Sequence, residues 1–421
     1  MRPHLPWRQT ERRDLRLWPV GTVLALAFAT AIAVAGAVFF VGWDLLGAQG
    51  LKSERRLTSQ TLFDLVKLSF GAVAGAGALV ALVVAYRRQR VDEDGVQRET
   101  TRLHTERFTT AVSQLGEKSA AVRLGGVHAL TGLADDAPTR QLRQTCIDVL
   151  CAYLRLPYAA ADDLPQGDAA ARHEHLALRE VRHTVIRLIR DHLRLPPEHP
   201  HSWQGHDLDF TGVTFDGGDF GGAVFSGGRV TFDGAQFSKG MVDFRLAQFS
   251  GGTVSFVGAV FSGCRVNFGG AKFTEGMVAF AAAVFSGGRV AFDAAFSGGT
   301  VDFVFAEFSG GTVDFLFTEF SGSTVIFDHA LFSDGEVSFD HGQFSGGMVS
   351  FDHAQFSGGG VDFRRAWFSG GTVSFDHAQF LGGTLDLSHV DGVAPTGLIQ
   401  SSDSPLPSGL SLPSAWYARG P

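Results

Sequence analysis

The segment VSFDHAQFSGGG, at residues 349–360, contains one complete copy of the repeat that decides the fold. The same pattern, V-x-F-x-x-A-x-F-S-G-G-x, recurs every 12 residues in 14 units whose first positions run from Val230 to Leu385. Residues two apart lie on the same side of a strand, so V-x-F and A-x-F are predicted to be short strands with two inward side chains each. The links between them form corners, where Gly allows a positive φ.

A single unit is too small to be a complete coil, because a 12-residue turn has no room for two Phe, a Val and an Ala. We therefore expect two units per turn, which makes a four-sided coil of about 24 residues. Seven such coils at a spacing of about 4.8 Å predict a rod roughly 34 Å long. Four leading pentapeptides around Phe210 to Phe225 add about one coil, and the residue missing between Phe292 and Phe296 predicts one irregular corner.

The A-x-F pentapeptides, the VDF…FSGG units and the linking SWQGHDLDF (202–210) resemble the pentapeptide-repeat family. This resemblance implies a right-handed parallel β-helix with a quadrilateral coil. Most units insert two residues at alternate corners, which leaves the cross-section of the coil open. The best-known members of the family resemble DNA in shape and charge and protect DNA gyrase.

The whole layout, over about residues 19–390, is similar to membrane-bound pentapeptide-repeat proteins of actinobacteria. RFTTAVSQLG (107–116), AVRLGGVHAL (121–130) and RQTCIDVLCAYLRLPY (143–158) resemble the helical module found there. The resemblance thus implies a bacterial membrane protein.

Two uncharged stretches, 19–43 and 68–86, are each long enough to cross the ~30 Å hydrocarbon core as a helix. A signal peptide is the competing interpretation of the first stretch, but its apolar run is too long for a typical signal. We expect a transmembrane hairpin with a cytoplasmic arm at 1–18 and an external loop at 44–67. Gly71 and Gly75 predict close helix packing, either within the hairpin or in a homodimer.

Basic residues flank the predicted hairpin on both sides and predict its orientation. They include Arg2, Arg8, Arg12, Arg13 and Arg16 before the first span, and Arg87, Arg88 and Arg90 after the second. The positive-inside rule places both termini and the repeat domain in the cytoplasm.

Residues 91–200 have helical periodicity and predict a helical module, either a HEAT-like stack or a plain bundle. Val122, Val127, Leu130 and Leu133 mark the apolar face of its first helix, and 159–170 is expected to be a surface loop. Several histidines lie near the last helix, around a Glu180-x-x-His183 pair. A di-metal bundle needs a second such pair, so we interpret the histidines as polar surface residues rather than metal ligands.

Composition separates the repeat from the rest of the chain. Residues 203–390 form the predicted β-helix, and 203–395 carry 21 acidic and 8 basic side chains, a net charge of −13. That charge disfavours binding of nucleic acid. Residues 391–421, rich in Pro and Ser, predict a flexible tail.

Three groups of outward-facing residues are candidates for a partner surface, and each group also has an explanation that involves no partner. His329, His353 and His377 are expected to stack on one edge, as a metal-binding or proton-responsive ladder or as a duplicated repeat. Exposed apolar side chains can mark a partner or dimer surface, or can result from repeat duplication without a function. An acidic row can mimic DNA phosphates or simply keep the rod soluble. The apolar candidates are Phe305, Phe317 and Trp367, and the acidic row is Asp243, Asp314, Asp362 and Asp386.

No nucleophile–base pair, P-loop or dinucleotide fingerprint is present in the sequence, and no cofactor or metal is expected. We therefore expect a non-enzymatic, membrane-anchored scaffold whose cytoplasmic β-helix binds a protein partner. The alternative is an acidic DNA-mimic regulator of a DNA-binding enzyme such as gyrase.

Overall fold

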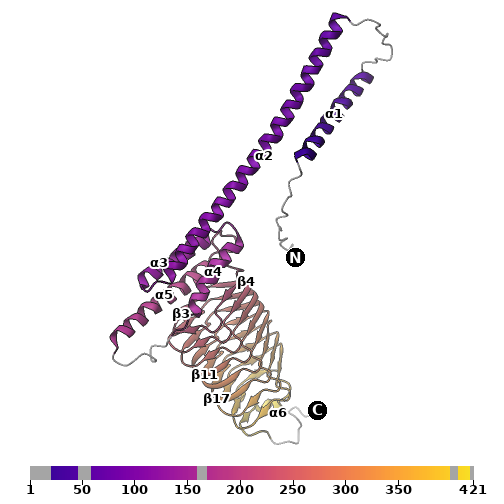
Figure 1. Cartoon of the computed structure of the whole chain (residues 1–421). Coiled ribbons are helices and arrows are strands. Elements are labelled where there is room, and N and C mark those ends of the chain that lie inside the picture. Colours follow the sequence, from indigo (N-terminus) through magenta and orange to yellow (C-terminus); the bar gives the residue numbers. More distant parts are fainter. Residues whose placement is uncertain (1–19, 46–57, 159–167, 399–405, 418–421) are drawn as a thin grey trace. The chain divides into compact units, whose positions relative to one another are not determined.

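A computed structural model describes residues 20–45, 58–158, 168–398 and 406–417. The chain divides into two compact units, Met1–Arg102 and Leu103–Pro421. The first contains two apolar helices, and the second contains a helical module followed by a parallel β-solenoid (Figure 1).

The first unit contains α1 (Val20–Leu45) and most of α2 (Ser59–Leu115). Phe28–Leu45 and Ser59–Gln89 are long and apolar enough to cross a membrane. The predicted span 68–86 lies inside α2, so the part of the predicted external loop from Ser59 onward is helical instead. The predicted arm 1–18 lies outside the described residues.

Gly71 and Gly75 do not pack against another helix among the described residues. Nothing lies within 4 Å of the position where a Cβ would stand on either glycine. Packing of these two residues within the hairpin is therefore not observed, and homodimerisation through them stays a prediction.

The helical module consists of the end of α2 and of α3 (Ala120–Asp135), α4 (Arg140–Arg155) and α5 (Ala169–Leu193). Its core contains Val127, Ile147 and Ile189, all fully buried. Gly126 allows α3 to cross α2 closely, since a Cβ there would lie 2.8 Å from the backbone nitrogen of Leu115. On the predicted apolar face of α3, Val127, Leu130 and Leu133 are buried, whereas Val122 is exposed.

Residues 159–167 of the predicted surface loop lie outside the described residues. Asp168 caps the following helix, because its carboxylate accepts hydrogen bonds from the N–H groups of Ala170 and Ala171 at 3.0 Å.

The repeat forms two parallel sheets. The first sheet contains β1 (Leu208–Asp209), β4 (Val224–Thr231), β7 (Gln248–Ser255), β10 (Lys272–Ala279), β12 (Ala295–Phe296), β13 (Thr300–Asp302), β15 (Glu319–Phe320), β16 (Thr324–Ile326), β18 (Gln343–Phe344), β19 (Met348–Ser350), β22 (Trp367–Phe368), β23 (Thr372–Ser374) and β26 (Asp391–Gly392). The second contains β2 (Thr214–Phe215), β3 (Gly218–Asp219), β5 (Gln236–Phe237), β6 (Met241–Asp243), β8 (Val260–Phe261), β9 (Arg265–Asn267), β11 (Val284–Ala291), β14 (Glu307–Asp314), β17 (Leu331–Ser338), β20 (Gln355–Phe356), β21 (Gly360–Asp362), β24 (Gln379–Phe380), β25 (Thr384–Asp386) and β27 (Leu410–Ser411).

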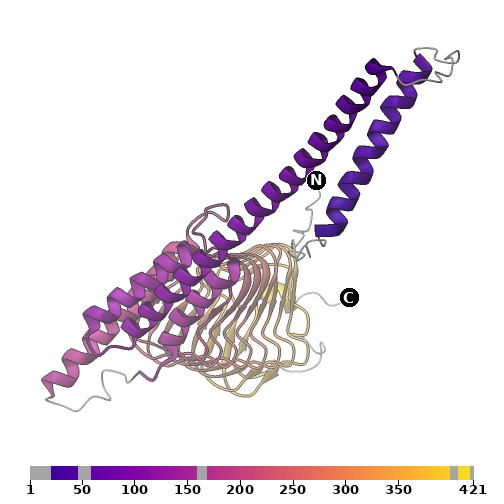
Figure 2. The same ribbon diagram turned by 45° about the horizontal axis from the view of Figure 1, so that its top comes forward.

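The register confirms the predicted coil of two repeat units. Val254 pairs with Val278, 24 residues later, and all the paired strands are parallel. The chain thus winds into a right-handed β-solenoid of about eight coils, and Figure 2 shows successive coils lying over one another.

Phenylalanine fills the interior of the solenoid, as the repeat predicts. Each ring stacks on the equivalent ring of the next coil, for example Phe232 on Phe256 with centroids 4.6 Å apart and planes 3° apart. Neighbouring columns meet edge to face, as Phe256 and Phe268 do at 80°. Both geometries are favoured by the ring quadrupole, so the core combines large apolar burial with specific ring packing.

The missing residue produces an irregular corner, as expected. Phe273 pairs with Phe296, only 23 residues later. Most corners of this kind close with a hydrogen bond from the N–H of the Ala to the C=O of the first Phe, whereas here the carbonyl of Phe292 accepts from the Thr318 hydroxyl of the next coil at 2.6 Å. Thr318 is fully buried and stands where most units have Ala. Its hydroxyl thus provides the hydrogen bond that a buried carbonyl of the previous coil needs.

Both ends of the solenoid are covered. At the first coil, α4 lies against β1 and α5 against β3. At the last coil, the N–H of Leu385 donates to the carbonyl of Gly409, and Trp416 of α6 (Ser414–Tyr417) meets Phe368 edge to face at 6.3 Å. The prediction of a flexible tail was wrong for residues 406–417, which cap apolar surface that a solenoid end would otherwise expose.

Candidate partner-binding edges of the solenoid

Each coil has four corners, which alternate between an F-x-x-A turn and an S-G-G corner. In the F-x-x-A turn of 327–330, the N–H of Ala330 donates to the carbonyl of Phe327 at 3.0 Å, and His329 has φ +57°. A positive φ at the third position is the mark of a type II turn, for which Gly is the favoured residue. The side chain at this position points away from the solenoid core.

Nine non-glycine residues with positive φ occur among the described residues, and all nine occupy this turn position. They are Leu246, Ala282, Phe305, Phe317, His329, His341, His353, Arg365 and His377. Most turns of the first coils have glycine there instead, as at Gly212, Gly234 and Gly258, where nothing lies within 4 Å of an added Cβ. Packing therefore does not require these side chains, although each costs about 1 kcal/mol of backbone strain. Strain kept without a packing reason points to a functional surface.

One line of these turns forms an exposed stack of rings, which we name the histidine edge: Phe305, His329, His353 and His377. Their centroids are 5.1, 4.9 and 5.0 Å apart in order along the rod. The stack predicted for the three histidines is confirmed, and Phe305 extends it by one coil.

The aspartates beside these histidines hold successive coils together. One carboxylate oxygen of Asp328 accepts hydrogen bonds from the Ser350 hydroxyl and from the N–H of Asp352 in the next coil. This carboxylate is therefore fixed along the rod rather than directed toward a histidine. Among the residues that the structure describes, no group of three or more His, Cys, Asp or Glu is arranged to hold a metal ion.

The other turns form a second line, which we name the tryptophan edge: Phe317, His341, Arg365 and Trp367. Phe317 and His341 have centroids 4.8 Å apart, and Arg365 contacts Asp340 at 2.6 Å. Trp367 is 55% exposed on β22, two residues after Arg365. Because turns and S-G-G corners alternate around the coil, the two edges lie at opposite corners.

The predicted acidic row shares one strand position, since Asp362 pairs with Asp386 in register. Each of its carboxylates accepts the backbone N–H two residues later, at 2.8 Å for Asp243, 3.0 Å for Asp314, 2.8 Å for Asp362 and 2.9 Å for Asp386. These are Asx turns, for which Asp and Asn are suited. The row therefore has a local structural role at the turns.

Two members of this row are not surface charges. Asp243 and Asp314 are buried and pair with Arg245 and Arg289. Asp386 lies nearer the surface. Burial alone would raise its pKa, but hydrogen bonds from Ser388 hold the pKa of Asp386 below its usual value.

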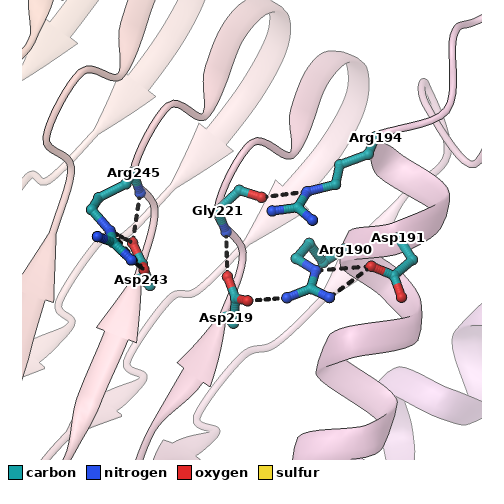
Figure 3. A network of polar contacts seen from close by, with 7 residues as sticks. All are labelled: Arg190, Asp191, Arg194, Asp219, Gly221, Asp243 and Arg245. Carbon is teal, nitrogen blue, oxygen red and sulfur yellow. Dashed lines mark hydrogen bonds and ion pairs between the residues drawn. The ribbon is translucent and has the colours of Figure 1, made fainter.

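Figure 3 shows how the same chemistry joins the helical module to the first coil. Asp219, one coil before Asp243, accepts the N–H of Gly221 at 2.8 Å and pairs with Arg190 of α5. Arg194 donates to the carbonyl of Gly221 at 2.6 Å. The guanidinium groups at the C-terminal end of α5 thus pair with the Asp219 carboxylate and the Gly221 carbonyl of the first coil.

A second contact network at this junction was missed by the sequence analysis. Asp216 accepts hydrogen bonds from Tyr158 at 2.7 Å and Arg179 at 2.8 Å, and contacts His183 at 3.1 Å. Burial would raise its pKa, but the hydrogen bonds from His183 and Tyr158 and the nearby positive charge bring the pKa of Asp216 down to about 2. The DGGD sequence at 216–219, which departs from SGG, is the only signal that could have indicated this contact.

The interpretation of the module histidines as polar surface residues was wrong for several of them. His175 and His206 are buried, and His192 is partly buried, where it stacks on Trp203 with centroids 4.3 Å apart and contacts Asp135. These side chains are covered by other segments of the chain, which helical periodicity alone does not reveal.

No known protein family, curated protein or solved structure matches this chain. The fold, with Phe at regular intervals in a parallel β-solenoid, is consistent with the pentapeptide-repeat fold.

Proposed function

We propose that this chain is a non-enzymatic scaffold, anchored in a membrane by its two apolar helices, whose solenoid binds a protein partner. The observation that carries the proposal is the set of large exposed side chains kept in strained left-handed turns where glycine fits freely. A rigid rod with side chains at fixed intervals is suited to bind a partner without reorganisation of its own backbone.

We assign the partner site to the tryptophan edge. Trp and Arg are the residues most enriched at energetic hot spots of protein interfaces, and this edge presents Trp367 and Arg365 beside Phe317. All three are exposed, and Trp367 and Phe317 are two of the largest exposed apolar side chains of the solenoid.

The anchor is supported by the exposed apolar surface of both helices. Phe40 of α1 and Phe70 of α2 are more than 70% exposed, and such surface needs an apolar environment. The basic residues around the spans favour a cytoplasmic solenoid. On this basis we extend the family resemblance to membrane-bound pentapeptide-repeat proteins of the actinobacterial type.

The alternative, a DNA-mimic regulator of a DNA-binding enzyme, has less support. It requires a row of free carboxylates, whereas Asp243 and Asp314 are buried in ion pairs and all four aspartates accept turn N–H groups. Local turn chemistry is a sufficient reason for the acidic row.

The test is proximity labelling in the native cell with full-length chains. The test variant combines Phe317→Gly with Trp367→Gln, since glycine suits the left-handed turn and Gln343 already stands in register with Trp367. A matched control combines Leu246→Gly, which lies on the same line of turns but three coils before Phe317, with Leu381→Ser. It removes two other exposed apolar side chains of the solenoid. We expect a client that is retained with the wild type and the control and lost with the test variant.

A client retained equally by all three chains would contradict the tryptophan edge as its site. Asp362→Asn with Asp386→Asn tests the alternative, because Asn267 makes the same turn contact at 2.8 Å without a charge. Loss of a DNA-binding client in that variant would favour the DNA-mimic function. A solenoid protected from protease in inverted membrane vesicles would contradict its cytoplasmic location.

A further inference from the structure

The histidine edge presents two parallel rows of different charge. Within each turn the aspartate comes first and the histidine second, so Asp328 and Asp352 lie in one row and His329 and His353 in a second row beside it. One oxygen of Asp352 is held by the Ser374 hydroxyl and by the N–H of Asp376 at 2.9 Å. The other oxygen has no partner among the described residues, so a fixed acceptor remains available beside the ring of His353.

The spacing of side chains along the two rows restricts which partner can contact them in every coil. Adjacent rings lie 4.9 to 5.0 Å apart, which is the rise of one coil. A partner contacts every coil equivalently only if it has the same rise. A second copy of this solenoid has that rise by construction.

The order of charges also decides the relative orientation of two copies. A two-fold axis parallel to the rod places the aspartate row of one copy opposite the histidine row of the other, on both sides of the axis. A two-fold axis perpendicular to the rod places aspartates opposite aspartates, which is unfavourable. The parallel arrangement also sets Phe305 opposite Val304 of the second copy, which pairs two apolar side chains at the start of the edge.

We propose that the histidine edge is the surface through which two copies of this chain associate side by side, in parallel and in register. This goes beyond the proposed function, because it assigns the opposite corner of the coil to self-association and leaves the tryptophan edge free for the client. It rests on the proposed membrane anchor for one point only, the local concentration of the two copies.

Local concentration matters because the edge is narrow. It is one or two side chains wide, so its contact area is smaller than the roughly 800 Å² that each partner contributes to a standard interface. The acidic surfaces of the two solenoids also repel each other. Two chains held in one membrane have a high effective concentration, which offsets both effects.

The test is a pair of matched cysteine variants in full-length chains in native membranes. His353→Cys lies on the histidine edge and His341→Cys on the tryptophan edge, both at left-handed turn positions with φ of +59° and +57°. A disulfide needs Cα atoms about 4.4–6.8 Å apart, which only residues next to the two-fold axis satisfy. Cys146, Cys151 and Cys264 are buried, so the wild-type chain provides a low background. After mild oxidation, we expect severalfold more disulfide-linked dimer from H353C than from H341C on a non-reducing gel.

Equal yields from the two variants, or no dimer from H353C, would overturn the proposal. A mixture of H329C and H353C chains that links better than H353C with itself would overturn the in-register arrangement. In addition, Asp328→Asn should lower the H353C yield, because His329 is unchanged in that variant and the amide keeps one acceptor for Ser350 but loses the charge. Sedimentation of the same membranes reports the anchor separately. If the chain stays soluble, the anchor fails, and the same comparison at raised protein concentration decides the edge.

Discussion

The two kinds of corner in each coil adopt a similar backbone and tolerate different side chains. At the S-G-G corner, Gly311 has φ +70°, and a Cβ would lie 2.7 Å from the carbonyl carbon of Gly287 in the previous coil. At the F-x-x-A turn, Gly258 has φ +63°, and nothing lies within 4 Å of an added Cβ. Glycine is thus required by the neighbouring coil at the packed corner, and only favoured by backbone strain at the open turn. Of the two kinds of corner, only the open turn can therefore carry a binding side chain at its left-handed position.

The first coil extends this comparison, because it has no previous coil for its packed corners to meet. The helical module takes that place. A Cβ on Gly217 would lie 3.1 Å from the His183 ring, and one on Gly218 would lie 3.1 Å from Ile186. The packed corner therefore selects glycine against either backbone or helix side chains.

The largest expected effect is at the packed corner. Gly311→Ala should destabilise the solenoid by about 3 kcal/mol, because backbone overlap with Gly287 adds to the left-handed strain. Gly258→Ala, at the open turn, should cost only about 1 kcal/mol. Urea unfolding of the detergent-solubilised chain, followed by circular dichroism, measures both. Equal losses would show that the contact with the previous coil is not what separates the two corners.

The second prediction concerns His206. Its backbone carbonyl oxygen would lie 2.6 Å from a Cβ added to Gly228. Burial, followed by the charges of Arg140 and Arg143, lowers the pKa of His206 to about 4. In the unfolded chain, this histidine binds a proton below about pH 6.5. The free energy of unfolding is therefore highest above that pH, and it falls by at most about 3 kcal/mol as the pH decreases to about 4. His206→Phe should remove this decline in urea unfolding between pH 7.5 and 4.5. An unchanged pH dependence would contradict the assignment.

The third prediction tests the packed corner at α5. The pKa of Asp216, about 2, lies below the ordinary value, so the carboxylate stabilises the folded state above about pH 4 and this contribution is lost as the pH falls toward 2. Asp216→Asn should therefore destabilise the chain by about 2 kcal/mol at pH 7 and differ little from the wild type at pH 2. A deficit that persists unchanged in acid would point to lost packing rather than lost charge.

The smallest effect is expected at the open turn and has the opposite sign. His353→Gly should stabilise the solenoid by up to about 1 kcal/mol, because it relieves the left-handed strain and removes no core contact. Gly258→His should lose a similar amount in the same unfolding assay. A loss of stability in His353→Gly would mean that the ring stack contributes more to folding than its exposure suggests.

The sequence by itself determined the solenoid, because its information is periodic. The alternation of Val, Phe, Ala and Phe defines which side chains point inward, and their volume requires two units in each coil. The same periodicity located the stack of His329, His353 and His377, since residues 24 apart must lie above one another. The missing residue before Phe296 predicted the irregular corner for the same reason.

Only the tertiary structure decided which outward residues are free. Asp243 and His353 are both polar outward positions of the repeat, yet Asp243 is buried in an ion pair and His353 is exposed. The cap formed by 406–417, the docking of α5 on Asp216 and the burial of His206 also depend on contacts between segments that share no repeat. A repeat specifies the contacts that recur in every coil, whereas contacts made once, at the ends and junctions, leave no periodic signal in the sequence.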